Sequence, residues 1–184
     1  MPRVRTLYWA YGANLNVEAM RHRCPGARKI KKLCLPYGRL TFRGVADCEL
    51  VDDPTSVIQG GVWSITPDDE LKLDDFEGFP KGYTKSYIKV KRNGRPEKVM
   101  FYKMNLRDDE LKYQGPPYGG YYEGIVQGYR DFGLDEAYLL EALERSWDQK
   151  NWSEKMRERW MRKGSPSLTR MTMEDIDLED DDWR

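Results

Sequence analysis

Near its N-terminus the chain reads Tyr8-Trp9-Ala10-Tyr11-Gly12-Ala13-Asn14-Leu15. The β-branched and aromatic residues of the segment 4–11 predict a strand. Gly12 predicts the tight turn that ends this strand, because glycine tolerates a positive φ. In such a turn the backbone N–H groups from Gly12 to Leu15 can point into one space and bind a carboxylate or an oxyanion. Many turns between a strand and a helix carry Gly and Asn only to make the bend, so the motif by itself does not define a site.

A short helix and several further strands are predicted after this turn. Asn14 or Asn16 is suited to cap a helix that ends at Pro25-Gly26. Asn93-Gly94 is a strong hairpin signal between two strand-like runs. The segments with strand-like composition are 33–43, 56–65, 83–92 and 97–104. Strands separated by turns and short helices predict an α+β fold.

More helices are predicted in the middle of the chain. Thr66 is a natural N-cap and Pro67 suits the first helical position, which predicts a helix whose apolar side is formed by Leu71, Leu73 and Phe76. The segment 115–122 is rich in Pro, Gly and Tyr, and we expect an ordered loop there. A helix is predicted over 124–132, followed by a longer helix through Leu139, Leu140, Leu143 and Trp147.

The strongest candidate for chemistry is Glu77, which follows the helix that begins at Thr66. Phe76 and Phe79 flank it in the sequence. An apolar neighbourhood raises the pKa of a carboxyl group toward the range useful for proton transfer at neutral pH. The alternative is an ordinary glutamate at the end of a helix, before a turn. Asp74 and Asp75 are expected on the solvated side of the same helix.

The composition restricts both the compartment and the chemistry. The chain has 184 residues, 31 basic and 31 acidic side chains, one His and three Cys, which suits a single compact domain. The cysteines show neither a disulfide framework nor CxxC spacing, and no signal peptide or apolar run of about 18 residues is apparent. A reduced, cytoplasmic protein is therefore predicted. With His22 as the single histidine, a multi-histidine metal site is excluded, and catalysis by carboxylates or backbone dipoles is favoured.

Taken together, the segments 8–15 and 73–78 resemble two motifs of the γ-glutamylcyclotransferase-like family. In that family the first strand ends in Tyr-x-x-Tyr-Gly-Ser-Asn-Leu, and the catalytic glutamate lies in Leu-Asp-x-x-Glu-Gly. Pro80 and Tyr83 match the extension of the second motif in its bacterial form. Three weaker matches follow in the family's order: Gly61-Val62-Trp63, Tyr102-Lys103-Met104-Asn105 and the loop from Pro117 to Tyr121. The resemblance covers about residues 6–134. The chain departs from the family where Ala13 replaces the usual serine, and where Tyr118-Gly119-Gly120 stands in place of Ser-Pro.

The resemblance implies a fold, a reaction and a set of site residues. The fold is a small mixed β-barrel wrapped by short helices. The reaction is cofactor-independent and metal-independent: the α-amine of a γ-glutamyl amino acid or γ-glutamylamine attacks its own γ-carbonyl, giving 5-oxoproline and a free amine. Glu77 is the implied catalytic acid–base. The implied substrate-binding residues are Tyr8, Trp9, Ala10, Tyr11, Gly12, Ala13, Asn14 and Leu15, with Tyr83 and Tyr121 closing the pocket.

Two other functions remain open at this point. The same pocket can bind a ligand without turnover, in a partner-binding or regulatory protein. Alternatively, the protein can transfer or cleave another γ-glutamyl compound with the same residues and a different leaving group. A small γ-glutamyl molecule is the expected partner, neither nucleic acid nor a membrane is expected, and the oligomeric state is open.

The C-terminal part of the chain is expected to be separate from the chemistry. A final helix is predicted over 153–164, where Trp152, Met156 and Trp160 recur every four residues. Basic residues between the tryptophans are compatible with nucleic-acid bases stacking on the indoles, but this period is more typical of a helix packed on the protein body. Residues 174–182 hold seven acidic residues and no basic one, which favours a disordered, solvated end over an interaction tail. We therefore expect a γ-glutamylcyclotransferase-like domain over 1–134, helices packed on it over 135–163, and an acidic tail over 164–184.

Overall fold

The computed structural model describes residues 4–92, 95–107 and 114–147. The strands of these residues are β1 (Thr6–Ala10), β2 (Arg28–Pro36), β3 (Gly38–Phe42), β4 (Ala46–Leu50), β5 (Val57–Ile65), β6 (Tyr83–Arg92) and β7 (Arg95–Met104). The helices are the 3-10 helix η1 (Ala13–Leu15) and the α-helices α1 (Val17–Arg23), α2 (Pro67–Glu77), α3 (Gly119–Phe132) and α4 (Glu136–Trp147). The predicted α+β class is confirmed. The Asn93-Gly94 turn, the predicted helix over 153–164 and the acidic tail lie outside the described residues.

The strand β1 is the centre of a five-stranded mixed sheet with the order β2-β5-β1-β7-β6. It pairs antiparallel with β5, where Trp9 lies opposite Val62, and parallel with β7, where Leu7 lies opposite Val99. The other neighbours, β2 with β5 and β6 with β7, are antiparallel. Because β1 is flanked on both sides, the turn that follows it emerges from the middle of the sheet.

The pairing of the described strands does not confirm a closed barrel. Tyr37, with φ 60°, separates β2 from β3, and β3 pairs with β4 in a second, two-stranded sheet. The seam between the two sheets is bridged by side chains: the Tyr83 hydroxyl donates to the Ala46 carbonyl at 3.1 Å, and Asp47 Oδ1 accepts from the Met104 N–H at 3.2 Å. This seam borders the cavity described below.

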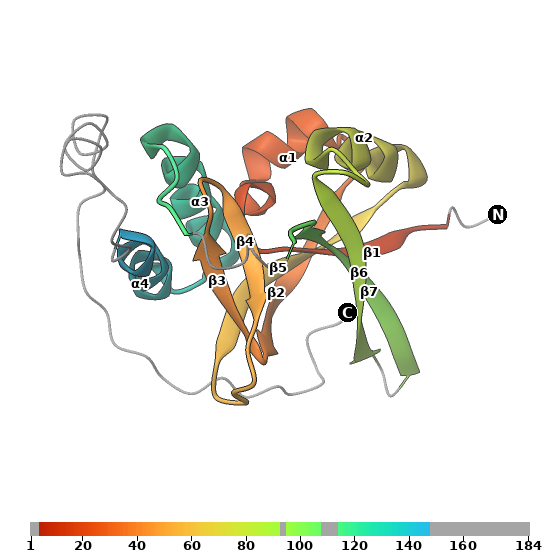
Figure 1. Cartoon of the computed structure of the whole chain (residues 1–184). Coiled ribbons are helices and arrows are strands. Elements are labelled where there is room, and N and C mark those ends of the chain that lie inside the picture. Colours follow the sequence, from red (N-terminus) through yellow and green to blue (C-terminus); the bar gives the residue numbers. More distant parts are fainter. Residues whose placement is uncertain (1–3, 93–94, 108–113, 148–184) are drawn as a thin grey trace.

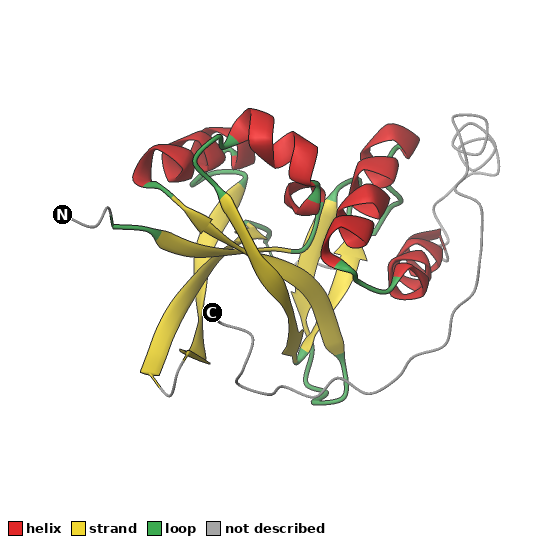
Figure 2. Cartoon of the chain, turned by 180° about the vertical axis from the view of Figure 1, so that it is seen from behind, coloured by secondary structure: helices red, strands yellow, loops and turns green. Residues whose placement is uncertain are grey.

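The helices gather at one end and one side of the strands. In Figure 1, α1 and α2 lie above the end of the five-stranded sheet, whereas α3 and α4 flank the hairpin β3–β4. The view from behind shows the same grouping above and beside the long strands (Figure 2). The predicted starts of two helices are confirmed: Asn16 caps α1 by accepting from the Ala19 N–H, and Thr66 forms a capping box with Asp69 at the start of α2. No helix of the described ranges is both long and apolar enough to cross a membrane.

Three boundaries differ from the sequence predictions. The strand predicted over 33–43 begins earlier and is divided at Tyr37, whose left-handed backbone ends the ladder of β2. Strand β4 was not predicted because acidic residues interrupt its sequence; one of them, Asp47, is buried and paired with Arg43. Helix α3 begins at Gly119 rather than at residue 124, since Tyr122 is buried against Phe42 and extends the helix into the predicted loop.

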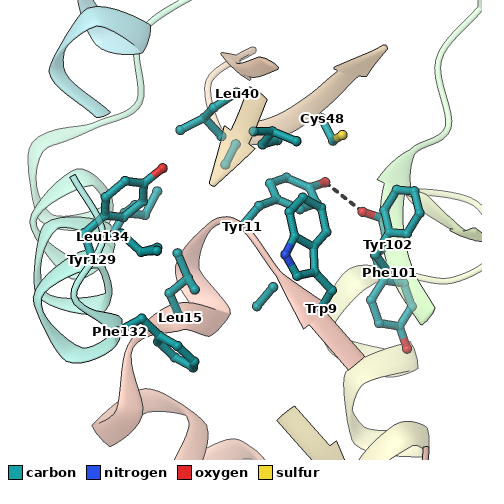
Figure 3. Close-up of a cluster of buried hydrophobic side chains, with 14 of the residues drawn as sticks. Trp9, Tyr11, Leu15, Leu40, Cys48, Phe101, Tyr102, Tyr129, Phe132 and Leu134 are labelled. Carbon is teal, nitrogen blue, oxygen red and sulfur yellow. Dashed lines mark hydrogen bonds between the residues drawn. The ribbon is translucent and has the colours of Figure 1, made fainter. Parts of the chain in front are cut away.

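The core is built around β1 and the helix α3 (Figure 3). The Trp9 side chain is fully buried and its indole N–H donates to the Leu33 carbonyl at 2.9 Å. A side chain at Gly60 would come within 2.4 Å of this indole, so the glycine allows β5 to pass close to Trp9. The Tyr11 hydroxyl donates to the Tyr102 carbonyl at 2.7 Å, which joins the end of β1 to β7.

Candidate active site

The end of β1, the end of α2, the start of α3 and the seam between the two sheets surround a cavity of about 170 Å³. This volume is well above the roughly 10–15 Å³ that a single water molecule needs by the same kind of measure, so the cavity has room for a group the size of one amino acid. Among the described residues that line it, Glu77 is the one that carries a charge. The lining residues are Tyr8, Tyr11, Gly12, Ala13, Asn14, Val45, Ala46, Phe76, Glu77, Tyr83, Tyr102 and Tyr121.

The turn after β1 forms one wall of the cavity. Its glycine was predicted for a positive φ, but Gly12 has φ −131°. The glycine is needed for a different reason: a Cβ at Gly12 would lie 2.9 Å from the Cβ of Ala46 on β4. The Leu15 N–H donates to the Gly12 carbonyl at 2.9 Å within the turn. The N–H groups of Gly12, Ala13 and Asn14 are therefore the candidates for binding an anion.

Glu77 is the last residue of α2 and faces this turn. The helix ends because Gly78 adopts the left-handed conformation, with φ 63°. The Glu77 Oε1 accepts from Asn14 Nδ2 at 2.9 Å. Burial raises the pKa of Glu77 to about 7, although the charge of Arg23 and the hydrogen bond from Asn14 oppose the shift. A carboxyl group with this pKa can both accept and return a proton at neutral pH.

Asn14 connects Glu77 to Arg23. Its amide nitrogen donates to Glu77 and also to the Tyr8 hydroxyl at 2.8 Å, and its amide oxygen accepts from Arg23 Nη1. The guanidinium of Arg23 lies over the ring of Phe76, 3.4 Å from the ring centroid. The Asn14 side chain therefore holds Glu77 rather than the substrate. The sequence did not indicate Arg23 as a site residue, because its position at the end of α1 does not show that α1 packs beside the turn after β1.

Tyrosine side chains form most of the remaining wall. The Tyr121 hydroxyl accepts from the Ala46 N–H at 3.1 Å, so that both Tyr83 and Tyr121 hold the same residue of β4. Burial is the main cause that raises the pKa of Tyr8, Tyr11, Tyr83 and Tyr121, and the nearby Glu77 adds to it. These hydroxyls stay protonated at neutral pH, and they present neutral polar groups to a ligand.

Several residues proposed for the site lie elsewhere. Trp9, Ala10 and Leu15 are buried in the core and are not among the residues that line the cavity. Of the two phenylalanines beside Glu77, Phe76 lines the cavity, whereas Phe79 lies beside Lys85. The apolar side predicted for α2 is also incorrect, because Leu73 alone is buried while Leu71 and Phe76 are exposed.

Asp74 was expected on the solvated side of α2, and the structure corrects this. Its carboxylate accepts from the Tyr102 hydroxyl at 2.5 Å and from Lys85 Nζ at 2.9 Å. Lys85 also donates to Glu70 at 2.7 Å. Because Tyr102 lines the cavity and Asp74 lies one turn before Glu77, this cluster ties the helix that carries Glu77 to the hairpin β6–β7. Within the described part of the chain, no group of three or more His, Cys, Asp or Glu side chains is placed to hold a metal ion.

The family model described as "Gamma-glutamyl cyclotransferase, AIG2-like" matches residues 8–123 of this chain. The matched segment contains the turn after β1, Glu77 and Tyr121. No curated protein sequence matches the chain.

Solved structures share the fold at low sequence identity. An uncharacterized protein from Homo sapiens has a TM-score of 0.63 at 24% identity, and the match covers 85% of this chain and 98% of that one. A gamma-glutamyl cyclotransferase has a TM-score of 0.61 at 23% identity, covering 86% of this chain and 99% of that one. YkqA from Bacillus subtilis has a TM-score of 0.61 at 15% identity, covering 79% of this chain and 55% of that one.

Proposed function

Since the chain belongs to the AIG2-like gamma-glutamyl cyclotransferase family, we propose that it converts a γ-glutamyl amino acid or a γ-glutamylamine into 5-oxoproline and a free amine. Glu77 is the general acid–base of this reaction. The observation that carries the proposal is a carboxyl group with a pKa of about 7, lining an amino-acid-sized cavity and held 2.9 Å from Asn14 Nδ2.

The reaction needs one group that first removes a proton and then returns it. The Glu77 carboxylate accepts a proton from the α-ammonium group of the substrate, which frees the lone pair of the nitrogen. This nitrogen bonds to the γ-carbonyl carbon, and the bond from that carbon to the leaving nitrogen breaks as Glu77 returns the proton to the leaving nitrogen. The attacking nitrogen loses a second proton as the ring forms. The freed Glu77 carboxylate takes up this proton and passes it to the released amine, which leaves as an ammonium ion, so that Glu77 ends ionised as it began.

The wall opposite Glu77 supports binding of the carbonyl oxygen. As charge develops on this oxygen, backbone N–H groups held by a folded turn stabilise it without having to reorganise. The N–H groups of Gly12, Ala13 and Asn14 are suited to this role. Ala13 replaces the hydroxyl-bearing residue usual in the family and keeps the backbone donor, so the substitution does not remove this contribution.

The size of the cavity is compatible with an intramolecular reaction. A glutamyl group of five carbons must curl for its α-nitrogen to reach its own γ-carbon. A cavity of about 170 Å³ has room for this group in the curled form. Holding the two reacting atoms in contact supplies the positional advantage of the reaction.

The test is a screen of γ-glutamyl compounds in which 5-oxoproline is detected by mass spectrometry. Glu77→Gln is expected to lower kcat by about 100-fold to 10,000-fold, because an amide cannot take and return the proton. Glu18→Gln, at an exposed glutamate of α1, is the matched control and is expected to keep full activity. A wild-type protein that forms no 5-oxoproline, or a Glu77→Gln variant within about threefold of wild type against that expected loss, contradicts the proposal. Retention of an unreacted metabolite by an inactive protein favours ligand binding without turnover.

A further inference from the structure

The cavity is open on one side, and the solvent exposure of its lining residues shows which side this is. Six of the lining residues are buried and form the closed end: Tyr8, Tyr11, Gly12, Asn14, Ala46 and Tyr102. Phe76 is 50% exposed, and the other partly exposed lining residues are Ala13, Val45, Glu77, Tyr83 and Tyr121. These six residues therefore border the mouth. A glutamyl group bound at the closed end, beside Glu77, would direct the amine attached to it toward the open side of the cavity.

Apart from Glu77, the mouth is lined by apolar and aromatic groups. Val45 comes from the turn between β3 and β4, Phe76 from the last turn of α2, and Tyr121 from the first turn of α3. Tyr118 adds to the same side, since its ring packs on Tyr121 at 5.7 Å between centroids and is 61% exposed. Exposed aromatic side chains gathered at a pocket mark a binding surface more often than scattered ones do.

The Phe76 wall is fixed in place and carries positive charge on one side. The Arg23 guanidinium, 3.4 Å from the Phe76 centroid, is itself held by the Asn14 amide oxygen. In the step in which Glu77 carries the proton, the charge of Arg23 is not offset by Glu77. A second ammonium group on the leaving amine would then be repelled at this wall.

We propose that Val45, Phe76 and Tyr118 form an apolar subsite for the leaving amine. The preferred substrates are γ-glutamyl compounds whose amine carries an aliphatic or aromatic side chain without a distal cation. This inference rests on the proposed cyclotransferase function and adds the class of amine that is released.

Three matched substrates test the subsite: the γ-glutamyl amides of n-pentylamine, methylamine and 1,5-diaminopentane. The pentyl and methyl compounds differ in apolar length, and the pentyl and diaminopentane compounds differ in one terminal ammonium group. The kcat/KM of the pentyl compound is expected to exceed each of the other two by about tenfold or more, the discrimination typical of an apolar pocket.

Variants of the mouth residues test whether the preference for the pentyl compound arises there. Phe76→Ala and Tyr118→Ala are each expected to lower the pentyl-to-methyl ratio of kcat/KM by about threefold or more, as removal of an apolar contact does. Leu71→Ala, an exposed leucine on the same helix, is expected to leave the ratio unchanged. Phe76 also supports Arg23, but a loss of acid–base chemistry lowers both rates together and cancels in the ratio.

The outcomes separate the two proposals. Formation of 5-oxoproline from all three compounds at kcat/KM values within about threefold of one another, where the subsite predicts about tenfold, overturns the subsite and leaves the cyclotransferase function standing. A preference for the diaminopentane compound does the same. A protein that forms 5-oxoproline from none of the three, nor from any γ-glutamyl amino acid, overturns the proposed function itself.

Discussion

Arg23 acts on Glu77 both through space and through the Asn14 amide. Its positive charge favours the ionised carboxylate and holds the pKa of Glu77 below the value that burial alone would give. By accepting from Arg23, the Asn14 oxygen also fixes which end of the amide faces Glu77. Arg23 is thus a positioning residue, which reaches the reacting atoms only through Asn14 and Glu77.

Replacing Arg23 is expected to change the pH profile of the reaction. In Arg23→Met the Glu77 carboxylate loses a stabilising charge, so the acidic limb of the kcat/KM profile moves to higher pH, by roughly one pH unit at the low end for a nearby charge. Activity therefore falls more below pH 7 than above it. Arg21→Met, at an exposed arginine of the same helix, is the control. A drop in activity of equal size at every pH would mean that Arg23 acts on the fold alone.

Glu77 itself is expected to lower the stability of the folded protein at alkaline pH. Its folded pKa of about 7 lies above the unfolded value of 4.5, so the wild type loses stability as the pH rises between these two values. Glu77→Gln removes this cost while its amide oxygen can still accept from Asn14. The variant should be more stable than wild type at pH 8 by roughly 3 kcal/mol, and the difference should vanish near pH 4. Chemical denaturation at the two pH values measures it; a gain that does not depend on pH would contradict the raised pKa.

At the scale of elements, α2 is the part that brings Glu77 to the cavity, and its position depends on the cluster of Asp74, Lys85 and Tyr102. Lys85 donates to both Glu70 and Asp74 from the neighbouring strand β6. The ion-paired side chains of Lys85, Asp74 and Glu70 are between 15% and 24% exposed, so they are screened by solvent less than surface ion pairs are.

Breaking this tie is expected to cost stability and activity together. Asp74→Asn leaves Lys85 with a weaker partner and is expected to lower the free energy of unfolding by about 1–3 kcal/mol. The kcat is expected to fall as well, because Glu77 lies one helical turn away. Asp75→Asn, at an exposed neighbour, is expected to be neutral on both measures. Urea denaturation measures the free energy of unfolding of both variants, and the 5-oxoproline assay measures their kcat. If Asp74→Asn and Asp75→Asn gave the same values, the cluster would not position α2.

Local signals in the sequence predicted where helices and turns lie better than they predicted which elements pack against one another. The N-cap at Thr66, the cap of α1 at Asn14 or Asn16 and the turn after β1 depend on residues close in the chain, and each was predicted from them. Glu77 was also identified correctly as a carboxyl group with a raised pKa, although tyrosines and the β1 turn surround it rather than both flanking phenylalanines. Asp74 was placed wrongly, and Arg23 and strand β4 were missed. The partners that decide these three, Lys85, Asn14 and Arg43, are set by how whole elements pack.

The whole molecule builds one site from segments that are far apart in the sequence. Tyr8 and Asn14 come from the first strand and its turn, Ala46 from the second sheet, Glu77 from α2, and Tyr121 from α3. The family match over residues 8–123 spans all of these segments. The helix α4 packs on β3 beyond that span, and it contributes no residue to the lining of the cavity.

The central place of β1 also bears on how the chain is made. Its parallel partner β7 is joined to it through the pair Leu7 and Val99, so one edge of the first strand has no partner until most of the domain has left the ribosome. At about 5–20 residues per second, this interval lasts roughly 5–20 seconds. During it, β1 exposes the backbone edge and the aromatic side chains that later become the core, the kind of surface that chaperones cover. Translation speed between β1 and β7 is therefore expected to influence how much of the newly made chain escapes aggregation.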